Sequence, residues 1–88
     1  MQALFLNYNI FKGVIYMIRL RILDILEEQN HTKYWLFKQM DLSYQNFNRM
    51  ITNQTSSIRF DNLEKLSLIL NCSISDLFEI TIDNDASN

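Results

Sequence analysis

Apolar residues recur every three or four positions through most of residues 22–78, which is the spacing of amphipathic α-helices. Short polar stretches separate these stripes. The pattern predicts five helices, at about residues 22–30, 32–40, 43–52, 60–71 and 73–78. Because the chain has no proline and a single glycine, few residues oppose helix formation. The predicted fold class is therefore all-α, with five helices and a short extended arm at the N-terminus.

The second and third predicted helices begin at capping residues. Thr32 and Ser43 each precede an apolar stripe, and their hydroxyls can accept a hydrogen bond from a free amide of the first helical turn. Asp41 lies between the two helices, where a left-handed backbone is often needed, and aspartate tolerates that conformation better than most residues. Residues 32–50 thus predict two helices joined by a tight turn, which is the layout of a helix-turn-helix.

Four side chains share the exposed side of the third predicted helix: Tyr44, Gln45, Asn48 and Arg49. Such a helix fits the major groove of DNA, where each base pair shows a distinct pattern of donors and acceptors. Gln45 or Asn48 can bind an adenine edge with two hydrogen bonds, and Arg49 can do the same with guanine. The ring of Tyr44 can pack on a thymine methyl group, or its hydroxyl can bind a phosphate. These four are the candidate base-contacting residues.

The net charge of −2 argues against a nucleic-acid partner, but its distribution argues for one. Residues 31–60 carry four basic residues against one acidic residue, a balance of +3. Residues 1–30 are balanced, and residues 61–88 carry one basic residue against six acidic residues, a balance of −5. Backbone phosphates respond to the local field more than to the total charge. The middle third therefore remains a candidate DNA-binding surface.

Residues 1–16 are apolar without a clean helical period, and two interpretations stay open. One is a β-hairpin arm that packs on the domain or on a partner. The other is that natural translation starts at Met17, because residues 12–14 can be encoded by a bacterial ribosome-binding sequence at a suitable distance upstream. N-terminal sequencing of the native protein decides, since a chain that begins at Met1 excludes the second interpretation. Residues 17–22 alternate apolar and charged side chains and are expected to begin extended.

The remaining bulk properties predict a single small domain. Residues 1–16 form the N-terminal extension, residues 17–80 the helix-turn-helix domain, and residues 81–88 an acidic tail that we expect to be disordered. The single Cys72 excludes an internal disulfide and a multi-cysteine metal site. Because the sequence shows neither a membrane-spanning run nor a signal-peptide pattern, we expect a cytoplasmic protein without metal or cofactor.

Residues from about Met17 to Glu79 resemble the lambda-repressor-like DNA-binding domains (Cro and cI type, XRE family). Family members usually have alanine where Phe37 stands and glycine where Asp41 stands, and the large Phe37 predicts a wider spacing between the second and third helices. The resemblance rests on residues 32–36, Leu42-Ser43, Phe47-Asn48-Arg49-Met50, residues 60–70, and Asn71-Cys72-Ser73 leading to Asp76-Leu77-Phe78.

The resemblance implies roles for individual residues. It implies that residues just after the Ser43 cap, and residues one turn later, contact bases. These residues are Tyr44, Gln45, Asn48 and Arg49. It also implies that residues near the helix starts and in the loop after the third helix contact the DNA backbone. Helix N-termini bind phosphate through free amides and the helix dipole. The backbone-contacting candidates are Lys33, Ser43, Thr52, Asn53, Thr55 and Arg59.

These observations favour a sequence-specific transcriptional regulator that binds a double-stranded DNA operator, as a homodimer on two half-sites about one helical turn apart. The expected dimer surface is the fifth helix with Phe78 and Ile80, or the N-terminal arm. The alternative is a protein-interaction or antitoxin-like module on the same fold, which the acidic C-terminal third would suit. No phosphate-binding loop, nucleophile–base pair or metal-ligand spacing occurs, so we expect neither enzymatic activity nor a small-molecule ligand.

Overall fold

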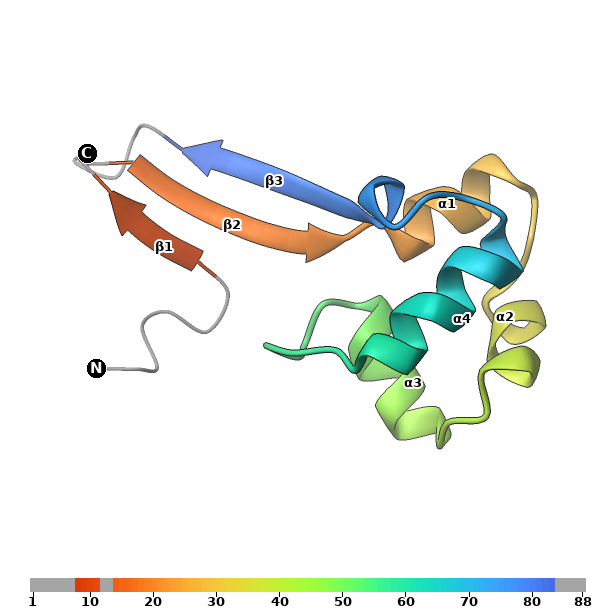
Figure 1. The fold of residues 1–88 in the computed structure, drawn as a ribbon. Helices are drawn as coiled ribbons and strands as arrows, with labels where there is room; N and C mark the ends of the chain where they lie inside the picture. Colours follow the sequence, from red (N-terminus) through yellow and green to blue (C-terminus); the bar gives the residue numbers. More distant parts are fainter. Residues whose placement is uncertain (1–7, 12–13, 84–88) are drawn as a thin grey trace.

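The computed structural model describes residues 8–11 and 14–83. In the sequence, two strands precede the helices and one strand follows them. Figure 1 shows β2 and β3 running side by side away from the packed helices. In chain order the elements are β1 (Tyr8–Phe11), β2 (Val14–Leu20), α1 (Ile22–Glu28), α2 (Lys33–Met40), α3 (Tyr44–Ile51), α4 (Phe60–Leu70), a one-turn 3₁₀ helix (Ser75–Leu77) and β3 (Phe78–Asp83).

The three strands form an antiparallel sheet in the order β1-β2-β3. β2 pairs with β3 from Ile15↔Asp83 to Leu20↔Phe78, so the start of α1 lies beside the end of the 3₁₀ helix. A backbone hydrogen bond from the Arg21 amide to the Leu77 carbonyl (2.8 Å) continues this pairing beyond the strands. The sheet therefore joins the two ends of the helical region.

The prediction of an all-α fold with five helices is wrong at the C-terminal end. The described residues form four α-helices, one 3₁₀ turn and a three-stranded sheet. At the start of this last turn, the Ser73 Oγ accepts a hydrogen bond from the Asp76 amide (3.2 Å). The turn goes no further because residues 78–82 alternate apolar and polar side chains and pair with β2.

The structure also corrects part of the expected acidic tail. Residues 81–83 belong to β3, whereas residues 84–88 lie outside the described residues. At the other end of the chain, β1 and β2 pair antiparallel within the stretch interpreted as an arm, and residues 1–7 and 12–13 lie outside the described residues. Met17 lies inside β2, where it pairs with Thr81 of β3.

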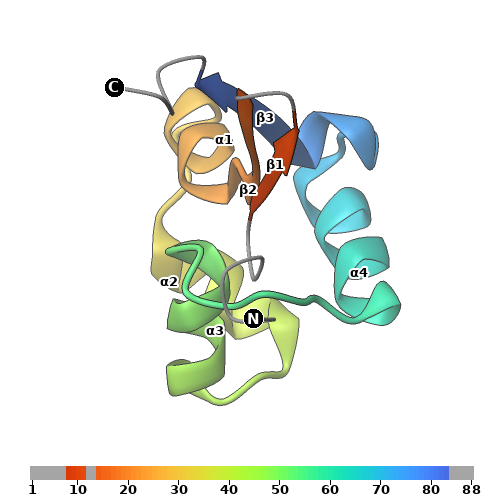
Figure 2. The same cartoon turned by 90° about the vertical axis from the view of Figure 1, so that its left-hand side faces the viewer.

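The hydrophobic core lies among the four helices and the base of the sheet. In the view of Figure 2, α4 lies on one side of the strands and α1 on the other. The buried core residues come from β2, all four α-helices and the 3₁₀ turn: Leu20, Ile22, Ile25, Leu26, Leu36, Met40, Phe47, Met50, Ile51, Leu66, Leu70 and Leu77. The stripes of the first four predicted helices thus form a common core.

The capping predictions for α2 and α3 are confirmed. The Thr32 hydroxyl accepts a hydrogen bond from the Trp35 amide (3.0 Å), and the Ser43 hydroxyl accepts one from the Asn46 amide (3.1 Å). Asp41 has the expected left-handed backbone, with φ 58° and ψ 44°. Because asparagine and aspartate tolerate this region, they can end helices where glycine is otherwise used. Among the described residues other than glycine, Asn30, Asn53 and Asn71 also have a positive φ.

The side-chain amide of Asn53 joins the end of α3 to the sheet. Its Oδ1 accepts a hydrogen bond from the Leu20 amide (2.7 Å), and its Nδ2 donates one to the Leu20 carbonyl (3.0 Å). Leu20 is buried, so its backbone groups need protein partners. This contact holds the last residue of β2 against the helix-turn-helix.

Replacing Asn53 by alanine is expected to lower the free energy of unfolding by about 1–3 kcal/mol, because the buried backbone groups of Leu20 lose their partners. Asn53→Gly is the matched control, since glycine also lacks the amide but adopts φ 60° without strain. Chemical denaturation of both variants measures the effect. A glycine variant as stable as the wild type would show that the hydrogen bonds to Leu20 contribute nothing.

Within the described part of the chain, no helix is long and apolar enough to cross a membrane; the longest, α4, has 11 residues. The same residues contain no group of three or more histidine, cysteine, aspartate or glutamate side chains that could hold a metal ion. Cys72 is a half-buried free thiol, and burial, together with the charge of Asp76, raises its pKa.

Candidate nucleic-acid interface

α3 has one buried face and one exposed face. Its inner residues Phe47, Met50 and Ile51 are buried in the core, which fixes the rotation of the helix about its axis. The outer face carries the four predicted base-contacting residues: Tyr44, Gln45 and Arg49 are exposed, and Asn48 is half-buried. The structure therefore brings all four together on one side of a single helix.

The polar groups on this outer face are available to a ligand. Among the described residues, the side chains of Asn48 and Arg49 form no hydrogen bond or ion pair with another residue. The other three arginines of the described residues are each paired with an acidic side chain: Arg19 with Glu79, Arg21 with Asp24 and Glu28, and Arg59 with Asp61. Asn48 and Arg49 can therefore bind base edges without first losing an internal contact.

Phe37 fills the contact between α2 and α3. Its ring centroid lies 5.2 Å from that of Phe47 and 5.4 Å from that of Tyr44, with interplanar angles of 62° and 81°. Both pairs have the edge-to-face arrangement that aromatic rings favour. Phe37, which stands where family members usually have the much smaller alanine, thus packs directly against α3.

Arg59 lies just before α4 and binds Asp61 on the first turn of that helix. Its Nε and Nη2 donate hydrogen bonds to the two carboxylate oxygens at 3.0 Å and 3.2 Å. The hydrogen bond from Arg59 lowers the pKa of Asp61, and the same contact raises the pKa of Arg59. Asp61 is therefore ionised at neutral pH, and a DNA phosphate would have to compete with it for Arg59.

Asp61→Asn is expected to tighten binding to any DNA duplex by roughly two- to fivefold, because it frees Arg59 and removes one negative charge. The slope of log affinity against log salt should steepen by about 1. Binding to a random-sequence duplex over a salt range measures both. Glu27→Gln is the control, since it removes the same charge from an exposed position on α1 that has no ion pair among the described residues. Equal changes in both variants would attribute the effect to net charge alone.

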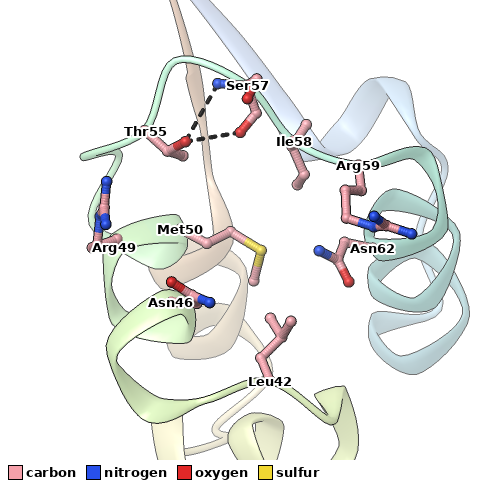
Figure 3. Close-up of a pocket in the computed structure, with 9 residues that line it drawn as sticks. All are labelled: Leu42, Asn46, Arg49, Met50, Thr55, Ser57, Ile58, Arg59 and Asn62. Atoms are coloured by element: carbon pink, nitrogen blue, oxygen red, sulfur yellow. Dashed lines mark hydrogen bonds between the residues drawn. The ribbon is translucent and has the colours of Figure 1, made fainter.

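A cavity of about 260 Å³ lies between α3, the loop that follows it and the start of α4. Figure 3 shows Asn46 of α3 and Asn62 of α4 on opposite sides of this cavity, with the side chain of Met50 extending between them and Leu42 below. Its polar rim carries Arg49, Thr55, Ser57 and Arg59. The cavity therefore lies beside the exposed face of α3 and has two arginines at its edge.

The six predicted backbone-contacting residues differ in their present partners. Lys33 is exposed on the first turn of α2 and has no ion pair within the described residues. The other five form polar contacts within the protein. Ser43 caps α3, the Thr52 hydroxyl donates to the Asn48 carbonyl (2.6 Å), and the Thr55 hydroxyl donates to the Ser57 carbonyl (2.9 Å). Arg59 binds Asp61, and Asn53 binds Leu20. Both polar ends of the Asn53 side chain already bind Leu20, and the assignment of Asn53 to the DNA backbone stays a prediction.

Sequence reasoning missed Asn46 and Asn62 as members of this surface. Asn46 lies three residues before Arg49, so the i, i+3 spacing on a helix places both on neighbouring positions of α3. Asn62 lies in the first turn of α4, where free amides already favour an anion. Helical spacing was the available signal for Asn46, whereas the approach of α4 to α3 depends on tertiary packing.

The comparisons with known proteins decide the family. A family model described as the Cro/C1-type helix-turn-helix DNA-binding domain matches residues 21–83, which is more than half of the chain. The chain belongs to this family. The match to the Cro/C1-type domain includes all four α-helices and continues through β3, and it confirms the resemblance inferred from the sequence.

A solved structure shows the same Cro/C1-type fold. The crystal structure of a protein from Bacteroides fragilis, described as a "putative DNA-binding protein", matches with a TM-score of 0.63 and 30% sequence identity. The match covers 72% of this chain and 100% of that chain. No curated protein matches the sequence. The family and this structural relative support DNA binding as the activity of the chain.

Proposed function

We propose that this Cro/C1-type domain is a sequence-specific transcriptional regulator that inserts α3 into the major groove of a DNA operator. The observation that carries the proposal is the outer face of α3. Four side chains lie together there, while the buried side chains on the opposite face hold the helix in the core. The four are Tyr44, Gln45, Asn48 and Arg49. Asparagine, glutamine and arginine are the side chains that bind adenine and guanine edges with paired hydrogen bonds.

The residues around α3 supply the contacts to the DNA backbone. Lys33 is exposed at the start of α2, and Ser43 at the start of α3 lies where free amides point outward. Thr52 ends α3, and Thr55 and Arg59 line the cavity together with Asn46 and Asn62. Contacts on both sides of α3 would fix its position in the groove.

We further propose that the protein binds its operator as a homodimer through the sheet. Leu20 and Phe78 pair at the base of the sheet, and both pack on the core. The next pair on the same face, Ile18 and Ile80, is 53% and 61% exposed, and Ile82 further along is 56% exposed. The core thus continues outward as an uncovered apolar strip.

Charge along β3 favours a second copy of the chain as the partner of this strip. β3 is an edge strand, so its outer backbone groups can pair with a second β3. An antiparallel pair centred on Ile80 places Ile82 opposite Phe78 and Glu79 opposite Thr81. A pair centred on Thr81 places Glu79 opposite Asp83, which is unfavourable because the two charges are alike. The first register joins the two apolar strips on one face.

Selection of bound sequences from random duplex DNA tests the proposed function. We expect an enriched site composed of two symmetric half-sites whose centres lie about 34–36 Å apart, one turn of the DNA helix. Failure to enrich any sequence would contradict sequence-specific recognition. An enriched but asymmetric single site would retain the role of α3 and contradict the dimer.

A further inference from the structure

A chain of aromatic rings runs from the core to the outer face of α3. Phe47 is fully buried, Phe37 is half-buried, and Tyr44 is 59% exposed. The ring of Phe37 lies edge-to-face with both of the others, at 5.2 Å from Phe47 and 5.4 Å from Tyr44. An exposed tyrosine ring at the start of the helix is thereby held by a ring that is itself fixed by the core.

Tyr44 is oriented by its ring and not by its hydroxyl. Its ring also lies 6.4 Å from that of Phe47, at an interplanar angle of 37°. Within the described residues, its hydroxyl forms no hydrogen bond with another residue. Since edge-to-face contacts have a preferred geometry, Phe37 limits the directions in which the Tyr44 ring can point.

The start of α3 therefore presents an apolar surface beside a polar one. Tyr34 of α2 is 65% exposed, and its ring centroid lies 6.4 Å from that of Phe37, so Phe37 lies near a second exposed ring. Gln45 and Arg49 on the same face of α3 are polar. In the major groove, the apolar group on a base edge is the C5-methyl group of thymine, and the other base atoms that face the groove are mainly donors and acceptors.

We propose that Phe37 is a positioning residue that holds the Tyr44 ring against the 5-methyl group of a pyrimidine in the operator. The inference rests on the proposed insertion of α3 into the major groove. Thymine supplies this methyl group in ordinary DNA, and 5-methylcytosine presents the same group. Phe37 itself contacts no base and acts through Tyr44.

Replacement of thymine by uracil in the selected operator tests the inference, because uracil lacks only the methyl group. Each thymine is replaced in turn, and the affinity of the full-length protein is measured for every duplex. We expect one position in each half-site at which the loss of the methyl group weakens binding by about fourfold, the value for one apolar carbon removed from a contact. A scan without any such position, on an operator that is still bound specifically, would overturn the inference and leave the proposed function intact.

Three variants separate positioning from a structural role. Phe37→Leu keeps an apolar side chain in the α2–α3 contact but loses the ring. We therefore expect the methyl preference, which is the ratio of the affinities for the thymine and uracil duplexes, to fall toward one. The affinity for the uracil duplex should stay almost unchanged. Phe37→Tyr keeps the ring and should restore the preference. Tyr44→Phe should retain it, because the ring and not the hydroxyl makes the contact.

The opposite outcomes are equally distinct. If Phe37→Leu weakens the thymine and uracil duplexes equally, Phe37 serves the fold alone and the inference is wrong. If Tyr44→Phe removes the preference for the thymine duplex over the uracil duplex, the hydroxyl and not the ring is responsible for it, and the inference is also wrong. If the wild-type protein selects no sequence at all, the proposed function fails and the inference falls with it.

Discussion

Replacing Ile80 by lysine is expected to leave the protein monomeric and to weaken its binding to a symmetric operator by about a hundredfold or more, because the gain from two linked half-sites is lost. Ile80 lies on the edge strand and is 61% exposed, in the pair with Ile18 that the proposed dimer would cover. A lysine at this position opposes pairing of two edge strands. Sedimentation gives the oligomeric state, and titration of the operator gives the affinity.

Leu68→Lys is the matched control for this prediction. Leu68 is 81% exposed on α4 and lies outside the apolar strip, so its replacement makes the same change of charge and polarity elsewhere. We expect this variant to stay dimeric and to bind the operator at least as tightly as the wild type. A dimeric Ile80→Lys variant with unchanged affinity would show that the sheet is not the dimer surface.

Replacing Arg49 by alanine is expected to weaken binding to the best operator by roughly 1–3 kcal/mol and to relax the preference at one base pair of each half-site. The side chain is exposed on α3 and has no ion pair among the described residues, so its loss removes a DNA contact without breaking an internal one. Its removal should leave the free energy of unfolding nearly unchanged. Affinities for operators changed one base pair at a time measure the effect.

Lys33→Ala is the comparison that gives this result its meaning. Lys33 is assigned to a phosphate, so its removal should weaken binding to all duplexes similarly and reduce the slope against log salt by about 1. If Arg49→Ala behaves in the same way as Lys33→Ala, Arg49 contacts the backbone and not a base. If neither change affects operator binding, the assigned surface is wrong.

Local patterns were sufficient to predict the helix-turn-helix. The positions of α2 and α3 follow from Thr32 and Ser43, whose hydroxyls cap the two helices, and from Asp41, whose left-handed backbone makes the turn between them. These signals lie within a few residues of the structure that they specify. For the same reason, the shared exposed side of Tyr44, Gln45, Asn48 and Arg49 could be predicted from their spacing alone.

The C-terminal strand could not be predicted in the same way. Ile74, Leu77 and Phe78 fit a helical stripe, and only the partner strand β2, about sixty residues away in the sequence, makes the extended conformation favourable. Residues 17–22 alternate apolar and charged side chains, and residues 78–82 alternate apolar and polar ones. Two short alternating segments at opposite ends of the chain are the signal that would have indicated an antiparallel pair.

The role of Asn53 shows a second limit. Its place in a polar loop after α3 favours a backbone phosphate, as does the family resemblance. The structure shows that both ends of the amide also bind Leu20, a contact across 33 residues of sequence. The contact depends on where α3 ends relative to β2, which no local pattern specifies. Arg59 also has a partner that the sequence-based assignment leaves out. Its ion pair with Asp61 partly neutralises a positive charge that the sequence alone presents as free.

The most direct test of sequence-specific DNA binding is a comparison of two duplexes over a range of salt, from about 50 to 300 mM. One duplex carries the selected operator and the other carries the same bases in scrambled order. We expect the affinity for both to fall steeply as salt rises, because phosphate contacts release counterions, while the operator stays the tighter-bound duplex throughout. Equal affinity for both duplexes, or no binding to either at the lowest salt, would contradict the assignment of α3 and favour a protein partner.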